Sequence, residues 1–231
     1  MTITLITGAN KGLGFETARR LTGLGHTVYL CARDSERGKA AARSVGAHFV
    51  QLDVTDDASV DDAAAFVRAD AGHLDVLVNN AGVAGSLAAP ADLTADMVEN
   101  VYQTNVFGLV RVTHAMLPLL RASTSPVIVS VSNGMGSFGL VTDPAHPGFA
   151  FPAVAYGSSK AAVSALTVQY AKALPEIRIN AVDPGYTATD LNGKSGTQTV
   201  QEGTDAIVRL ATIDAHGPTG TFSNRHGPLP W

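Results

Sequence analysis

The stretch TITLITGANKGLG, residues 2–14, joins a short apolar run to a glycine-rich turn. The run at 2–7 is typical of a buried β-strand, and the amphipathic pattern at 12–24 predicts a helix directly after the turn. Gly8 and Gly12 would let the backbone bend toward a ligand, and the helix N-terminus would offer free N–H groups to phosphates. The stretch therefore predicts a unit that holds the pyrophosphate of a dinucleotide. A simple tight turn is the alternative, since the spacing differs from the plain G-x-G-x-x-G pattern.

The alternation of strand and helix continues along the whole chain. Near-continuous apolar strands separated by helices are typical of a parallel sheet covered on both faces. The sequence thus predicts a doubly wound α/β fold in a single domain over residues 1–231, with Gly25 as a left-handed residue at the end of the first helix. The expected strands are 2–7, 26–31, 47–52, 74–79, 126–131 and 178–183, and the expected helices are 12–24, 35–45, 56–71, 94–120, 156–174 and 199–212.

The composition argues against several classes of protein. Of the 231 residues, 45% are hydrophobic and 16% charged, which is ordinary for a compact domain. A formal net charge of −4 argues against nucleic acid or an anionic membrane surface as a partner. No run approaches the roughly 18 apolar residues of a membrane span, and the N-terminus resembles no signal segment, so we expect a cytoplasmic protein. The seven histidines are scattered, which argues against a metal site, and Cys31 lies in an apolar run typical of a buried, inert thiol.

Basic residues follow the second predicted strand, where the adenosine ribose of a dinucleotide should lie. The strand ends in YLCARD, so Arg33 stands at its tip. Together with Lys11 in the glycine turn, and with Arg37 one turn further on, it could bind a 2′-phosphate. We therefore expect NADP(H) as the preferred cofactor. Two alternatives remain: these side chains are ordinary surface charges, or Asp34 binds a ribose hydroxyl and NAD(H) is used.

The segment YGSSK places Tyr156 and Lys160 four residues apart within a predicted helix. This spacing puts both side chains on one face, one turn apart. A phenol is a poor acid–base group at neutral pH, and a neighbouring ammonium group would favour the phenolate. The pair is therefore a candidate acid–base centre, while a packed Tyr beside a surface Lys is the alternative.

Seven motifs occur in a characteristic order: TGANKGLG, LDV, NNAG, TNVFG, IVSVSN, YGSSK and DPGYTATD. This succession resembles the short-chain dehydrogenase/reductase family over essentially the whole chain. The segments NKG, ARDSERG and LDVLVNNAG, and the ending EGTDAIVRLATIDAHGPTGTF, resemble its carbonyl-reductase-type, NADP-dependent branch. The resemblance implies a Rossmann-type sheet of order 3-2-1-4-5-6-7. It also implies hydride transfer from NADPH to ketones or aldehydes, or the reverse reaction on alcohols.

The resemblance also implies roles for individual residues. Tyr156 would exchange a proton with the substrate oxygen, and Lys160 would bind the nicotinamide ribose and lower the pKa of Tyr156. Asn105 would lie at a helix irregularity and hold a water linked to Lys160. The implied cofactor contacts are Gly8, Asn10, Lys11, Gly12, Leu13 and Gly14 at the phosphates, Asp53 and Val54 at the adenine, Asn79, Ala81 and Gly82 along the ribose, and Pro184, Gly185, Thr187 and Thr189 at the nicotinamide.

One motif departs from the family pattern. After its fifth strand the family usually has N-[IV]-S-S, whose second Ser orients the substrate carbonyl, and here SVSN places Ser132 at the first Ser and Asn133 at the second. An amide can donate a hydrogen bond but cannot relay a proton as a hydroxyl can. Three interpretations remain: Asn133 is the donor, Ser132 moves into its place, or catalysis is impaired. The last would make the protein an NADP-binding regulator or redox sensor.

Two segments near the expected site indicate how a substrate would reach it. The irregular stretch 138–155 should cover one side of the cleft with Phe138, Phe149 and Phe151, unless these rings pack the loop down. The short polar segment 190–201 suggests a reduced lid and an open site for varied ketones, aldehydes or ketoesters. His226 and Trp231 would either cap the domain or reach a neighbouring subunit. A homo-oligomer through helices 94–120 and 156–174 is compatible with the sequence.

Overall fold

The computed structural model describes residues 1–86 and 88–231 and contains one eight-stranded sheet of order β3-β2-β1-β4-β5-β6-β7-β8. Strands β1 to β7 run parallel to their neighbours, and β8 pairs antiparallel with β7. The predicted order 3-2-1-4-5-6-7 is therefore confirmed, with one added hairpin strand. The strands are β1 (Ile3–Ile6), β2 (Thr27–Ala32), β3 (His48–Gln51), β4 (Val76–Asn79), β5 (Val127–Val131), β6 (Arg178–Val182), β7 (Phe222–Asn224) and β8 (Gly227–Pro228).

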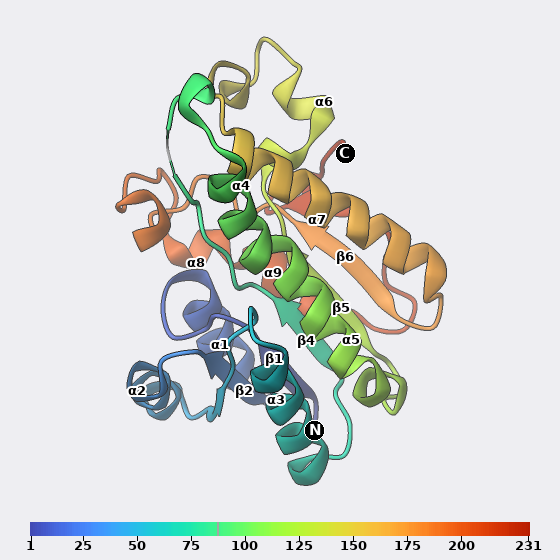
Figure 1. The fold of residues 1–231 in the computed structure, drawn as a ribbon. Helices are drawn as coiled ribbons and strands as arrows, with labels where there is room; N and C mark the ends of the chain where they lie inside the picture. The colour runs from blue at the N-terminus through green and yellow to red at the C-terminus, as the bar shows by residue number, and fades with distance from the viewer. Residues whose placement is uncertain (87) are drawn as a thin grey trace.

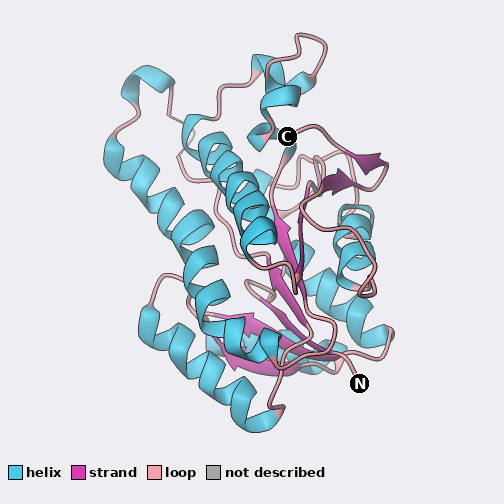
Figure 2. Ribbon diagram, turned by 90° about the vertical axis from the view of Figure 1, so that its right-hand side faces the viewer, coloured by secondary structure: helices cyan, strands magenta, loops and turns pink. Residues whose placement is uncertain are grey.

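Helices cover both faces of the sheet (Figures 1 and 2). One face carries α1 (Gly12–Gly23), α2 (Ser35–Val45) and α9 (Asp205–Ala211), and the other carries α3 (Asp57–Asp70), α5 (Gly108–Arg121) and α7 (Val154–Ala173). Neighbouring strand residues point to opposite faces, so Leu5 packs in one core and Ile6 in the other. This alternation produces two apolar cores that hold the sheet between its helical layers.

Three expected segments differ from the structure. The helix predicted over 94–120 is interrupted, since α4 (Ala95–Tyr102) passes into a π-helical turn (Gln103–Phe107) before α5 begins. The helix predicted over 199–212 breaks between α8 (Val200–Gly203) and α9. The stretch 138–155 is not one irregular loop, because it contains α6 (Phe138–Val141), the 3₁₀ turn Pro147–Ala150 and the start of α7.

Other local predictions agree with the structure. Gly25 follows α1 with a φ of +87°, as expected for a left-handed residue at a helix end. Cys31 is fully buried, and burial raises the pKa of its thiol, which is the environment of an inert cysteine. Among the described residues, no helix combines the length and apolarity needed to cross a membrane.

Candidate active site

The glycine-rich turn lies at the carboxyl end of β1 and leads into α1. Gly8 and Gly12 have φ values of +61° and +58°, a region that glycine adopts without strain. A Cβ at Gly8 would lie 2.9 Å from the Cα of Ala81, so the turn packs directly on the segment after β4. Lys11, the N-cap of α1, makes no side-chain cap, and no acidic residue lies in the first turn. The helix therefore begins with uncapped N–H groups, which suit phosphate oxygens.

Two residues that the sequence analysis did not single out hold this turn in place. The hydroxyl of Thr7 accepts hydrogen bonds from the backbone N–H groups of Asn80 and Ala81, each at 2.9 Å. The Asn80 amide in turn donates to the carbonyl oxygens of Thr7 and Gly8 at 2.8 and 3.1 Å. Because a Cβ at Gly14 would lie 2.5 Å from the same amide nitrogen, only glycine fits there. Thr7 and Asn80 share one feature that the sequence could have revealed: each is a polar residue directly after one of two neighbouring strands.

The basic residues at the adenosine side are exposed, but two of the three have acidic neighbours. The Arg37 guanidinium lies 3.5 Å from the Asp34 carboxylate, and Asp34 also caps α2 by accepting from the Arg37 backbone N–H. Lys11 pairs with Asp190 at 3.0 Å, with both side chains more than half exposed. Such exposed pairs contribute little and exchange readily. Asp34 is thus engaged within α2, and its alternative role as a ribose ligand stays a prediction.

Asp53 and Val54 follow β3, and Asn79 ends β4. One Asp53 oxygen accepts hydrogen bonds from the backbone and hydroxyl of Thr55 at 2.9 and 2.7 Å, so this carboxylate also forms a strand-end turn. Val54 is buried, and Asn79 donates to the hydroxyl of Thr113 at 3.1 Å. Asn79 Oδ1 is buried without a partner among the described residues, which leaves one acceptor at the end of β4.

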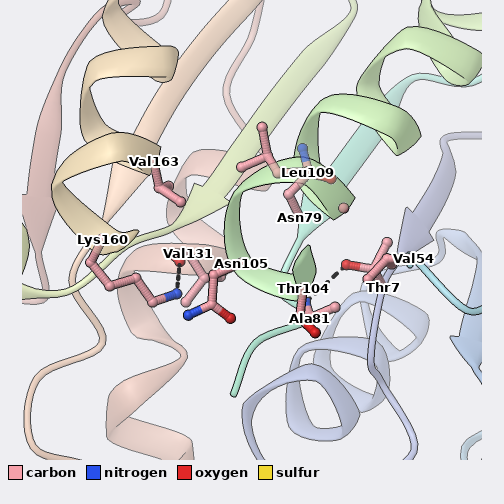
Figure 3. A pocket seen from close by; sticks show the side chains of 11 residues that line it. Thr7, Val54, Asn79, Ala81, Thr104, Asn105, Leu109, Val131, Lys160 and Val163 are labelled. Atoms are coloured by element: carbon pink, nitrogen blue, oxygen red, sulfur yellow. Dashed lines mark hydrogen bonds between the residues drawn. The ribbon is translucent and has the colours of Figure 1, made fainter. Parts of the chain in front are cut away.

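Tyr156 and Lys160 lie in the first turns of α7, on one face as predicted. Lys160 Nζ is 5.7 Å from the centre of the Tyr156 ring. The same nitrogen donates to the carbonyl oxygen of Val131 at 2.7 Å (Figure 3). Burial lowers the pKa of Lys160 to about 8 against the opposing effect of Asp183. Burial, and secondarily the Asp183 charge, raise the pKa of Tyr156. Desolvation of the phenol thus sets the direction of this shift, and the expected lowering of the Tyr156 pKa by Lys160 stays a prediction.

Asn105 lies within the π-helical turn, the irregularity expected around it. Its amide accepts from the Val83 N–H at 2.8 Å and donates to the Val83 carbonyl at 3.0 Å and to the Ser159 hydroxyl at 2.9 Å. Ser159, which the sequence analysis did not single out, donates to the Tyr156 carbonyl and so links Asn105 to the helix of the Tyr–Lys pair. Lys160 and Asn105 line a cavity of about 10 Å³, room for about one water (Figure 3).

The chain that leaves β5 carries Ser132 and Asn133, the two candidates for the carbonyl donor. The Ser132 hydroxyl is buried against α7, 3.0 Å from the Lys160 carbonyl and 2.9 Å from the Ser164 hydroxyl. The Ser132 hydroxyl is thus engaged with α7 in this structure, and its move into the donor position stays a prediction. Asn133 is partly exposed, and its amide donates to Asp183 at 3.4 Å. Asp183 was also missed in the sequence, although it directly precedes the Pro-Gly of DPGY.

The segment after β6 lies against the glycine turn. Gly185 has a φ of +69°, and its N–H donates to Asp183 at 2.9 Å. The Thr187 hydroxyl is buried and donates to the Pro184 carbonyl at 2.8 Å. A Cβ built on Gly12 would lie 3.8 Å from the methyl group of Thr189. The predicted phosphate and nicotinamide contacts are therefore brought together at one edge of the sheet.

The segment that precedes α7 exposes apolar side chains. Phe138, Phe149 and Phe151 are 71%, 53% and 55% exposed, so the alternative in which they pack the loop down is wrong. Trp231 stacks on Phe222, with ring centres 5.5 Å apart, and its carbonyl accepts from the Gly139 N–H. Trp231 therefore packs on its own chain, and the C-terminus lies beside α6 (Figure 1).

These features define an α/β protein of the Rossmann type. The glycine turn, the Tyr–Lys pair and Asn105 all belong to elements that meet at the carboxyl ends of the parallel strands, the usual ligand edge of such sheets. Within the described ranges, no three His, Cys, Asp or Glu side chains are arranged to hold a metal ion.

Comparison with known proteins identifies the family. A family model described as short chain dehydrogenase matches residues 2–199. Carbonyl reductase [NADPH] 1 of Bos taurus is 32% identical, with 99% of this chain and 98% of the relative covered. Short-chain dehydrogenase/reductase 1 of Saponaria officinalis is 34% identical, with 98% and 95% covered. The crystal structure of an NADPH-bound carbonyl reductase from chicken fatty liver superimposes with a TM-score of 0.87 at 28% identity and covers both chains completely.

The chain belongs to the short-chain dehydrogenase/reductase family. It is an oxidoreductase of the carbonyl reductase type, a class that reduces carbonyl compounds with NAD(P)H. The alignment with the Saponaria relative extends over 290 positions, more than the 231 residues of this chain, so that relative carries additional segments.

Proposed function

We propose that this protein reduces ketones or aldehydes with NADPH, and that Tyr156 donates the proton to the carbonyl oxygen. The observation that carries the proposal is the Tyr156–Lys160 pair on α7, which stands beside the end of β5 and across the sheet edge from the glycine turn. When bound, the dinucleotide supplies the hydride. The side chains of this chain bind it, orient the carbonyl and move the proton.

The proton-transfer groups suit the reductive direction. Because burial raises the pKa of Tyr156, the phenol stays protonated at neutral pH and can donate to an oxygen on which negative charge develops. Lys160 provides a positive charge within 6 Å of that ring and is the candidate ligand for the nicotinamide ribose. The water-sized cavity beside Lys160 and Asn105 supports the expected water that returns a proton to the pair. Asn133 takes the role of carbonyl donor through its amide N–H.

The cofactor contacts fit a phosphorylated dinucleotide. The uncapped N-terminus of α1 and the positive φ of Gly12 suit the pyrophosphate, with Asn10, Leu13 and Gly14 in the same turn. At the adenosine side, Arg33 is exposed and has no ion pair among the described residues, and Lys11 can leave its weak exposed pair with Asp190. NADP(H) is therefore the preferred cofactor, and the likeness to NADPH-dependent relatives supports this preference.

Reversing the charge at the tip of β2 tests this cofactor assignment. Arg33→Asp is expected to raise the KM for NADPH about 10- to 100-fold, because a charge-assisted bond to the 2′-phosphate is replaced by repulsion. The KM for NADH should change less than about threefold. Arg43→Asp, an equal charge reversal in the last turn of α2, is the matched control. Steady-state kinetics with both cofactors provide the measurement, and equal changes for NADPH and NADH would remove Arg33 from the phosphate site.

The side chains exposed around the site favour varied, mainly apolar substrates. Exposed rings at Phe138, Phe149 and Phe151 lie on the segment that leads into α7, and Tyr186 and Leu191 are exposed on the segment after β6. These side chains suit aryl or alkyl ketones, aldehydes and ketoesters.

A substrate panel tests the proposed function. NADPH oxidation is followed with aryl ketones, aldehydes and ketoesters, beside a direct titration of the protein with NADPH. We expect several members of the panel to be reduced at rates well above the background oxidation of NADPH. The second candidate function, an NADP-binding regulator or redox sensor, is motivated by Asn133 in place of the usual serine. NADPH binding without oxidation across the whole panel would favour that function instead.

A further inference from the structure

A buried carboxylate at the edge of the candidate site is not among the proton-transfer, carbonyl-donor or cofactor-binding groups proposed above. Asp183 directly follows β6 and is only 9% exposed. Its Oδ1 accepts from the Gly185 N–H at 2.9 Å and from the Asn133 amide at 3.4 Å. A Cβ at Gly134 would lie 3.3 Å from its other oxygen. The carboxylate is therefore packed between the chain segments that leave β5 and β6.

The contact with Asp183 fixes which way the Asn133 amide points. The Asn133 oxygen accepts from the Met135 N–H at 3.0 Å, while its nitrogen donates to Asp183. A flipped amide would turn its oxygen toward a carboxylate and its nitrogen toward a backbone donor, and both contacts would be unfavourable. Among the described residues, the amide nitrogen donates only to Asp183, so its second N–H is left for a ligand.

Burying a carboxylate is costly, which argues that this one has a use beyond filling space. Burial raises the pKa of Asp183, while hydrogen bonds from the backbone of Gly185 and Gly134 and the charges of His146 and Lys160 oppose that effect. An ionised carboxylate only accepts hydrogen bonds, so it holds an amide in one orientation. A serine hydroxyl, the usual donor at position 133 in the family, rotates freely and needs no such partner.

We propose that Asp183 is a positioning residue that holds the Asn133 amide so that its second N–H donates to the carbonyl oxygen of the substrate. The proposal rests on the proposed function, in which Asn133 is the carbonyl donor. It explains how an amide can stand at a position where the family usually has a hydroxyl: the pair Asn133–Asp183 together performs the task of one serine.

A double-mutant cycle tests this coupling. Asp183→Ala is measured in the natural chain and in the Asn133→Ser variant, with an aryl ketone that the natural enzyme reduces. If Asp183 acts through Asn133, Asp183→Ala lowers kcat about 10-fold in the natural chain and less than about twofold in the Asn133→Ser background. The KM for NADPH stays within about twofold in all four proteins. Asp183→Asn, whose amide oxygen can still accept from Gly185 and Asn133, is expected to keep kcat within about threefold of the natural enzyme.

The outcomes separate this inference from the proposed function. Equal losses of kcat in both backgrounds, no loss in the natural chain, or an Asp183→Asn variant as slow as Asp183→Ala would overturn the positioning role. Thermal unfolding checks that each variant is folded. If Asp183→Ala does not fold, Asp183→Ser replaces it, because its shorter hydroxyl can still accept from Gly185 but does not reach Asn133. Failure of the natural enzyme to oxidise NADPH with any ketone would contradict the proposed function itself.

Discussion

Replacing Tyr156 with phenylalanine is expected to lower kcat for ketone reduction about 10²- to 10⁴-fold, the usual contribution of a positioned acid. The ring and its packing against α7 are kept, so the loss reports the hydroxyl alone. Since Lys160 is anchored to the Val131 carbonyl and not to the phenol, its position should survive the change. The Kd for NADPH, measured by titration, is therefore expected to stay within about threefold.

Tyr170→Phe is the matched control for this prediction. Tyr170 lies on the same helix, packed at the edge of one apolar core and remote from the Tyr–Lys turn. Removing its hydroxyl should leave kcat within about twofold of the natural enzyme. A Tyr156→Phe variant that kept more than a tenth of the natural kcat would show that another group provides the proton.

Replacing Gly136 with alanine is expected to have the second large effect, on both folding and catalysis. A Cβ at Gly136 would lie 2.4 Å from the carbonyl carbon of Lys160 and 2.6 Å from the backbone nitrogen of Ala161. Both are backbone atoms of α7 and cannot rotate away. The helix must shift, which costs about 1–3 kcal/mol of the free energy of unfolding and displaces the Tyr–Lys pair. We expect a lower Tm and at least about a 10-fold loss of kcat.

Gly23→Ala provides the comparison for Gly136. Gly23 ends α1, and no atom lies within 4 Å of a Cβ built there. Alanine in that place should leave kcat unchanged and maintain or slightly raise the Tm. A Gly136→Ala variant with the Tm and kcat of the natural protein would contradict this prediction. The close approach of the turn after β5 to α7 would then not be needed to place Lys160.

The sequence was sufficient to predict the bounds of most elements, because period-2 and period-3.6 patterns are local, whereas the sheet order was implied by the family resemblance. It could not predict the π-helical turn around Asn105 by pattern, since residues 103–107 carry no glycine or proline. That turn is accompanied by contacts of Asn105 to Val83 and Ser159, which lie 22 and 54 residues away. The resemblance implied a seventh strand, but the pattern gave no bounds for β7 and no sign of β8, because strands of three and two residues give almost no periodic signal.

The residues of the candidate site also fall into two groups: those that the sequence motifs predict, and those that only the fold brings into contact. Motif order identified the glycine turn, Tyr156, Lys160 and Asn133 by position, but the partners that hold them are tertiary. Asp183 contacts Asn133 from a different strand, 50 residues away, and Asn80 holds the glycine turn from 72 residues away. Strand register decides that the Ser132 hydroxyl meets α7, which residue types alone do not reveal.

The most direct test of the account is the fate of the transferred hydrogen. The natural enzyme is given NADPH carrying two deuterium atoms at the nicotinamide C4 and a ketone that it reduces, and the alcohol is analysed by mass spectrometry. Hydride transfer to the carbonyl carbon predicts one deuterium on the carbinol carbon for each NADPH oxidised, and a loss of this product in Tyr156→Phe. An alcohol without deuterium, or bound NADPH that is never oxidised, would contradict the assignment of this protein as an NADPH-dependent carbonyl reductase.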